Sequence, residues 1–231
     1  YEFIGKVPKT DETLFAVNEG GSRNFQFFCY SAPETLACYI ENLERAWDRD
    51  GKGVFVGGIR RSSITVWAPL DIGGSSVGSA CHCPACRRAR AKGGEGLLMG
   101  LFIKRLCERV NERWPDKTVI YIPWAIPKCP ADVEFPDNLV VSHLNLDVMG
   151  LMREPSVRNL EEDRLRAWSA KSRRPVNMWI DFASPSDWTY GPVQYPHLVQ
   201  QFYQRNRPFL RGAYLTTYNA RIWVTSAPTF Y

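Results

Sequence analysis

The chain has 231 residues, of which 45% are hydrophobic and 23% are charged. This balance is typical of a globular protein and excludes a largely disordered chain, and no apolar run is long enough to predict a membrane span. The net charge of +5 is small for this length, and much of it stands in short basic runs typical of solvated surface, so we expect no nucleic-acid partner.

Runs of branched and aromatic residues predict strands along the whole chain. We expect them at 25–29, 63–68, 118–122, 138–144, 176–182 and 211–216. Apolar residues at helical spacing predict amphipathic helices at 36–47, 97–114 and 157–171, and a fourth helix that begins at Pro196. Ser31, followed by Pro33 and Glu34, is interpreted as a capping box at the start of the first helix.

This alternation of strands and helices predicts an α/β fold with a mostly parallel sheet, because parallel neighbours need a crossover connection. A complete (β/α)8 barrel of the TIM type takes about 250 residues. Six strands therefore favour a partial barrel that covers the later six or so strands. We expect residues 1–231 to form this single partial domain, truncated at the N-terminus and also at the C-terminus. An open doubly wound sheet is the structural alternative.

Two carboxylates are candidate catalytic residues. Asp181 ends a predicted strand in which it shares a face with Asn177 and Trp179, so it could act as a general acid or bind a sugar hydroxyl. It could also only cap the following loop. Asp71 stands in the glycine-rich loop after the strand 63–68, where it could be a second reactive carboxylate or serve only the turn.

Other side chains near the predicted strand ends could contact a sugar. Aromatic rings stack on the apolar faces of sugars, although packing beneath loops is the alternative when 13% of the chain is aromatic. The candidate substrate-binding residues are Trp67, Tyr121, Trp124, Asn145, Trp179, Tyr218 and Asn219.

The densest local pattern is a cluster of thiols, Cys81, Cys83 and Cys86, with His82 between the first two. Thiolates at this spacing can converge on one zinc ion, and three sulfurs indicate a structural rather than a catalytic metal. We therefore expect no cofactor for catalysis. The fourth ligand could be His82, Cys129 or His143. A disulfide between two of the three cysteines and free thiols are the alternatives.

The order of several segments resembles one bacterial family. These segments are Leu14-Phe15-Ala16-Val17 before Gly20-Gly21-Ser22-Arg23, then Phe28-Cys29-Tyr30-Ser31-Ala32-Pro33-Glu34, Asp71, the cysteine cluster, Pro115-Asp116-Lys117, Tyr121-Ile122-Pro123-Trp124 and Trp179-Ile180-Asp181-Phe182. Together they are similar to the family catalogued as domain of unknown function 4838, a relative of the α-glucuronidase type of glycoside hydrolase. The chain departs from that family at Leu70, where Asn is frequent, and at Phe182, where Tyr is frequent.

This resemblance implies a barrel, a carbohydrate substrate and export from a bacterial cell, so we expect a secreted or periplasmic protein. Our leading hypothesis is a glycoside hydrolase-like barrel that acts on a polysaccharide or oligosaccharide. In such an enzyme one carboxylic acid protonates the leaving oxygen and a second carboxylate acts as base or nucleophile, here Asp71 and Asp181. The alternative is a non-catalytic barrel that only binds carbohydrate.

Overall fold

The computed structural model describes residues 11–49, 59, 61–67, 81–123, 129–145, 154–181 and 196–216. The chain divides into two compact units, Tyr1–Val140 and Val141–Tyr231. Within the described ranges, we find no helix with the length and apolar character needed to cross a membrane.

The first unit opens with an antiparallel hairpin. A 3₁₀ turn, η2 (Glu12–Leu14), leads into β1 (Phe15–Val17), which pairs with β2 (Arg23–Phe28). The ring of Phe15 packs on Phe25 and Phe28, so the hairpin has a small aromatic core of its own. The segment 25–29 was expected to belong to the parallel series, but it pairs antiparallel with β1. This pairing was missed because β1 has only three residues, too few to predict from sequence.

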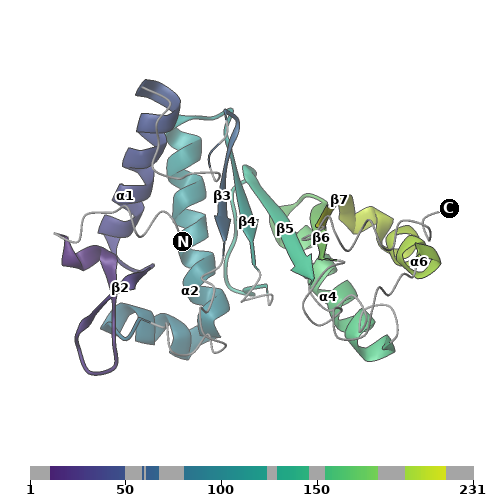
Figure 1. Cartoon of the computed structure of the whole chain (residues 1–231), viewed down its shortest axis with the longest axis horizontal. Coiled ribbons are helices and arrows are strands. Elements are labelled where there is room, and N and C mark those ends of the chain that lie inside the picture. Colours follow the sequence, from purple (N-terminus) through teal and green to yellow (C-terminus); the bar gives the residue numbers. More distant parts are fainter. Residues whose placement is uncertain are drawn as a thin grey trace, which may run out of the picture. The chain divides into compact units, whose positions relative to one another are not determined.

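Two helices follow the hairpin and lie side by side (Figure 1). The first, α1 (Pro33–Glu44), runs into a π-helical turn, η3 (Arg45–Arg49). The capping box is wrong: the N-cap is Ala32, which has no side chain to cap the helix. The hydroxyl of Ser31 instead accepts a hydrogen bond of 3.1 Å from the Cys86 thiol.

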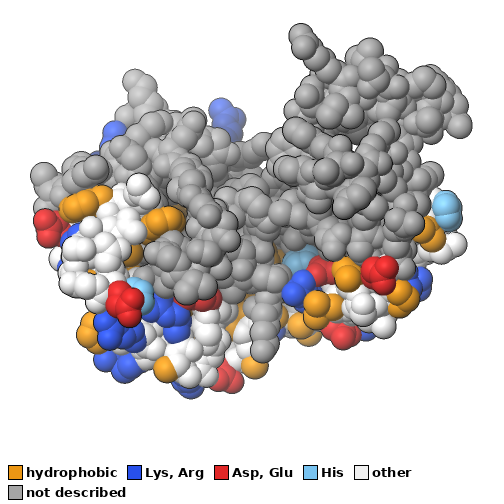
Figure 2. Space-filling model, turned by 60° about the horizontal axis from the view of Figure 1, so that its bottom comes forward, with side chains coloured by type: hydrophobic (Ala, Val, Ile, Leu, Met, Phe, Trp, Pro, Cys, Tyr) orange, Lys and Arg blue, Asp and Glu red, His pale blue; other side chains and the backbone are white. Residues whose placement is uncertain are grey.

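The second helix, α2 (Pro84–Arg113), is interrupted at Gly93 and Gly94, where Gly94 has φ +68°. Its later segment matches the predicted helix 97–114, and the expected apolar face is confirmed as buried: Leu98, Phe102, Leu106, Val110 and Trp114. The earlier segment carries the basic run, in which Arg87, Arg88 and Lys92 are exposed. Figure 2 shows such basic side chains interspersed with acidic ones on the described surface.

Strands β3 (Ser63–Trp67) and β4 (Thr118–Ile122) complete the first unit as a parallel pair, with Ser63 opposite Thr118 and Trp67 opposite Ile122. Helix α2 packs against β4. Buried side chains from both elements, among them Phe102, Leu106, Val119 and Tyr121, form the core of this unit.

The second unit consists of βα repeats. The elements are β5 (Leu139–Asn145, whose first residues belong to the first unit), α4 (Pro155–Ser172), β6 (Val176–Asp181), α6 (Pro196–Asn206), the turn η5 (Arg207–Phe209) and β7 (Leu210–Thr216). Both β5 with β6 and β6 with β7 pair parallel.

Within each unit neighbouring strands follow one another in chain order, β3 beside β4 in the first unit and β5 beside β6 beside β7 in the second. A mixed α/β fold with parallel pairing of β3 with β4 and of β5, β6 and β7 is thus confirmed. Closure into a barrel stays a prediction.

Candidate functional site

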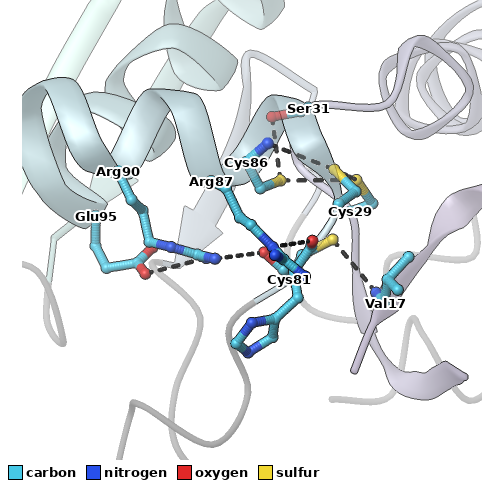
Figure 3. A network of polar contacts seen from close by, with 10 residues as sticks. Val17, Cys29, Ser31, Cys81, Cys86, Arg87, Arg90 and Glu95 are labelled. Atoms are coloured by element: carbon cyan, nitrogen blue, oxygen red, sulfur yellow. Dashed lines mark hydrogen bonds and ion pairs between the residues drawn. The ribbon is translucent and has the colours of Figure 1, made fainter. Parts of the chain in front are cut away.

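Four cysteine side chains meet where the β1–β2 hairpin packs on the start of α2 (Figure 3). The sulfur atoms of Cys29, Cys81, Cys83 and Cys86 all lie within 4.8 Å of one another. The Sγ of Cys29 is 3.7 Å from that of Cys83 and 3.8 Å from that of Cys86. We call this group the four-cysteine cluster.

Cys29 is held in place by the backbone just after β2. Its N–H donates to the carbonyl of Leu14 at 2.8 Å, which continues the pairing of the hairpin by one residue. Its carbonyl accepts hydrogen bonds from the N–H of Ala32 at 3.0 Å and from the Thr35 hydroxyl at 2.8 Å. The turn into α1 therefore fixes the direction of the Cys29 side chain.

The other three cysteines come from the segment that leads into α2. The N–H of His82 donates to the carbonyl of Val17 at 2.7 Å, so this segment lies against β1. Cys83 is the N-cap of α2, and its sulfur accepts a hydrogen bond from the N–H of Cys86 at 3.4 Å. Pro84 at the first helical position suits this start, since its missing N–H would have no partner there.

The cluster is closed to solvent on most sides. Cys29, Cys81 and Cys86 are buried, and Cys83 is partly buried. Ala16 and Leu98 belong to the same buried group, and Val17, Phe27, Ala32 and Ala89 pack around it. Apolar surroundings of this kind exclude water and strengthen electrostatic interactions among the sulfur atoms.

The thiols shift one another's pKa. Hydrogen bonds from Cys29 and Cys86 lower the pKa of Cys81 far below its usual range. The pKa of Cys29 rises to about 12, mainly because its thiol donates to Cys81, and the pKa of Cys86 rises through its hydrogen bonds with Cys29 and Cys81 and through burial. A bound metal cation deprotonates every thiol that coordinates it.

Two arginines hold the segment that carries Cys81 and His82 (Figure 3). Arg90 donates to the carbonyl of Cys81 at 2.6 Å and pairs with Glu95 at 3.3 Å. Arg87 donates through Nε to the carbonyl of His82 at 2.6 Å. The basic run after the cysteines is therefore partly exposed to solvent and also holds the backbone of Cys81 and His82 in place.

The sulfur atoms of Cys81, Cys83 and Cys86, the expected metal ligands, lie close together, and metal binding by them stays a prediction. The fourth member is Cys29, which sequence reasoning missed, and not His82, Cys129 or His143. His143 lies in the second unit, where its Nε2 is 2.5 Å from Oε2 of Glu161. The four cysteines of the cluster form no disulfide with one another in the described residues. The only signal for Cys29 was its place between a strand and a helix start.

The carboxyl ends of the parallel strands carry several of the other candidates. In the second unit Asn145 ends β5 and Asp181 ends β6, and these strands are neighbours, with Asn145 opposite Ile180. Asp181 in turn lies opposite Thr216, the last residue of β7. In the first unit Trp67 ends β3. Only the backbone of Trp67, Asn145, Trp179 and Asp181 is described.

Of the remaining candidate substrate-binding and catalytic residues, one is buried and the others lie outside the described residues. Tyr121 lies in β4 with only 1% of its surface exposed, and burial raises the pKa of its phenol. Asp71, Trp124, Tyr218 and Asn219 lie outside the described residues.

Sequence reasoning also missed a buried ion pair in the second unit. His143 on β5 contacts Glu161 on α4, and Glu161 also pairs with Arg164 one turn further along. Burial alone would raise the pKa of Glu161, but the hydrogen bond from His143 and the positive charges of both partners outweigh it and lower the pKa. This pair links a strand to the helix that follows it.

No protein-family model matches the chain, and no curated protein matches it. Among solved structures the chain is similar to a β-N-acetylhexosaminidase from Bacteroides fragilis NCTC 9343, with 17% identity and a TM-score of 0.44. The match covers 82% of this chain and 36% of that protein, so the chain spans only about a third of its length.

Proposed function

We propose that this chain is part of a glycoside hydrolase-like barrel that cleaves a polysaccharide or oligosaccharide. Asp181 is the general acid that protonates the leaving oxygen, and Asp71 is the second carboxylate, which acts as base or nucleophile. The resemblance to domain of unknown function 4838 supports the substrate class.

The observation that carries this proposal is the position of Asp181 at the carboxyl end of β6. Parallel α/β folds bind ligands and place reactive groups at the carboxyl ends of their strands. Asn145 ends the neighbouring strand β5, so an amide and a carboxylate occur at one edge of the same sheet. This combination suits a site that hydrogen-bonds sugar hydroxyls.

The pattern of burial along β6 agrees with this assignment. Val176 and Met178 are fully buried, whereas Asn177 between them is half-buried. Residues of a strand alternate between its two faces, so position 181 falls on the face of Asn177. Asn177 and Asp181, the two polar residues of the strand, therefore share a face with Trp179.

The test is the substitution Asp181→Asn in the full-length protein, assayed on a panel of aryl glycosides and polysaccharides. We expect turnover to fall by roughly 10²- to 10⁴-fold, the usual loss for a positioned proton donor. Substrates whose leaving group has a low pKa should lose less, because they need little protonation. The matched control is Asp163→Asn on α4, whose side chain is 74% exposed and pairs with Arg166 at the surface.

Two results would contradict the proposal. Normal turnover by Asp181→Asn together with a lower melting temperature would make Asp181 a structural cap. If the wild-type protein binds glycans but turns over no substrate, the protein is a non-catalytic carbohydrate-binding barrel and not an enzyme.

A further inference from the structure

We propose that Cys29, Cys81, Cys83 and Cys86 bind one Zn²⁺ ion, with Cys29 as the fourth ligand. The proposal rests on the geometry of the first unit and is independent of any activity at the strand ends. It assigns the four-cysteine cluster a structural role: the ion joins the β1–β2 hairpin to the start of α2.

The distances between the sulfur atoms match a single tetrahedral ion. Zinc binds thiolates at about 2.3 Å, so the edge of a regular tetrahedron of sulfurs around it is about 3.8 Å. The Sγ of Cys29 lies 3.7 and 3.8 Å from those of Cys83 and Cys86, and no pair in the cluster exceeds 4.8 Å. The thiols are therefore already placed to close on one ion with little movement.

The same distances argue against an iron–sulfur cluster. Such a cluster places its own irons and sulfides between the thiolates and so holds the cysteine sulfurs farther apart than a single ion does. Four thiolates also leave no open position for substrate or water, which is the arrangement of structural zinc sites.

Backbone groups around the cluster suit an anionic thiolate site. Four thiolates outweigh the charge of one divalent cation, and hydrogen bonds to the sulfurs offset this excess. The N–H of Val17 donates to Sγ of Cys81 at 3.3 Å, and the N–H of Cys86 donates to Sγ of Cys83 at 3.4 Å. Cys83 and Cys86 also lie at the N-terminus of α2, where the helix dipole favours negative charge. Such outer contacts orient the ligands of metal sites.

An ion at this place adds a metal–ligand connection to the hydrogen bond between His82 and Val17 that already joins the hairpin to the entry of α2. Strand β1 has three residues, and an isolated two-stranded hairpin is at best marginally stable in water. The cluster takes Cys29 from the end of the hairpin and the other three ligands from the entry to α2. One ion therefore ties together segments that are far apart in the sequence.

The decisive variant is Cys29→Ser, because only the folded structure assigns this residue to the site. Purified under reducing conditions, the wild-type chain should carry about one zinc per molecule by elemental analysis. Cys29→Ser should lose nearly all of it after dialysis against a chelator. Cys38→Ser, which removes a partly buried cysteine of α1 outside the cluster, should retain it.

X-ray absorption at the zinc edge of the wild-type protein keeps the proposal testable even if Cys29→Ser fails to fold. We expect four sulfur neighbours at about 2.3 Å. Nitrogen or oxygen in the first shell, equal zinc retention by Cys29→Ser and Cys38→Ser, a coloured iron centre, or a metal-free protein with a mapped disulfide among these cysteines would each overturn it.

Discussion

Glu161 is a buried carboxylate whose ionisation links the stability of the second unit to pH. Its pKa in the folded protein lies below the ordinary value of 4.5. The contribution to stability is therefore fully present above pH 4.5 and is lost as the pH falls through the lower, folded-state pKa.

Replacing Glu161 with Gln removes this titration. We expect the variant to be less stable than wild type at pH 7 by about 1–3 kcal/mol, because His143 and Arg164 lose a charged partner. The difference should shrink as the pH is lowered toward 3. Urea unfolding at several pH values measures it, with the exposed Glu112→Gln as the control. A difference that is constant with pH would mean that Glu161 contributes only packing.

Cys83 has two roles, as a proposed zinc ligand and as the N-cap of α2, and a substitution can separate their effects on stability. Its sulfur accepts the hydrogen bond from the N–H of Cys86, and serine is itself a favoured N-cap residue. Cys83→Ser should therefore keep the cap of α2 while releasing zinc, and the protein should melt at a lower temperature. Calorimetry with and without added zinc measures the effect. A variant that melts like wild type, or that still responds to zinc, would argue against Cys83 as a ligand.

At the scale of elements, the regular strands were predictable and the contacts between distant segments were not. The strands β3 to β7 lie within one residue of the predicted ranges, because runs of branched residues mark buried parallel strands. Sequence could not show β1, which has three residues, or the helical segment before Gly93, which has too few apolar residues to show a helical period.

The candidate sites show the same division. Cys81, Cys83 and Cys86 are close in sequence, so local spacing was enough to group them. Cys29 joins them only because the hairpin folds back onto the start of α2. The misread capping box has the same cause, since Ser31 contacts Cys86 from another part of the chain.

Helix α2 packs closely at Gly100, and this gives a prediction for the element. A Cβ added there would lie 2.7 Å from Cγ of Pro130 and 3.2 Å from Cγ2 of Val133. Gly100→Ala should destabilise the protein by about 1–3 kcal/mol through overpacking, although alanine is the better helix former. Gly20→Ala, with nothing within 4 Å, should change stability little. Urea unfolding of both variants measures the two changes in stability. A Gly100→Ala variant more stable than wild type would show that Pro130 and Val133 move aside at little cost in free energy.

At the scale of the whole molecule, the proposed zinc site belongs to the first unit alone. All of its ligands lie within Tyr1–Val140, and the second unit has its own strands and helices. Chelation should therefore raise amide hydrogen exchange in β1, β2 and the start of α2, while β6 and β7 keep their protection. Exchange measured by mass spectrometry before and after zinc removal tests this. Equal loss of protection in both units would mean that the ion stabilises more than the hairpin.

The proposal that sugar binds at the carboxyl ends of the parallel strands is tested most directly by a crystal structure of the full-length protein with a bound oligosaccharide. We predict that the carboxyl group of Asp181 lies about 2.6–3.2 Å from a glycosidic oxygen, within reach for proton transfer. An oligosaccharide bound elsewhere, with the Asp181 carboxyl group capping the loop that follows β6, would contradict it.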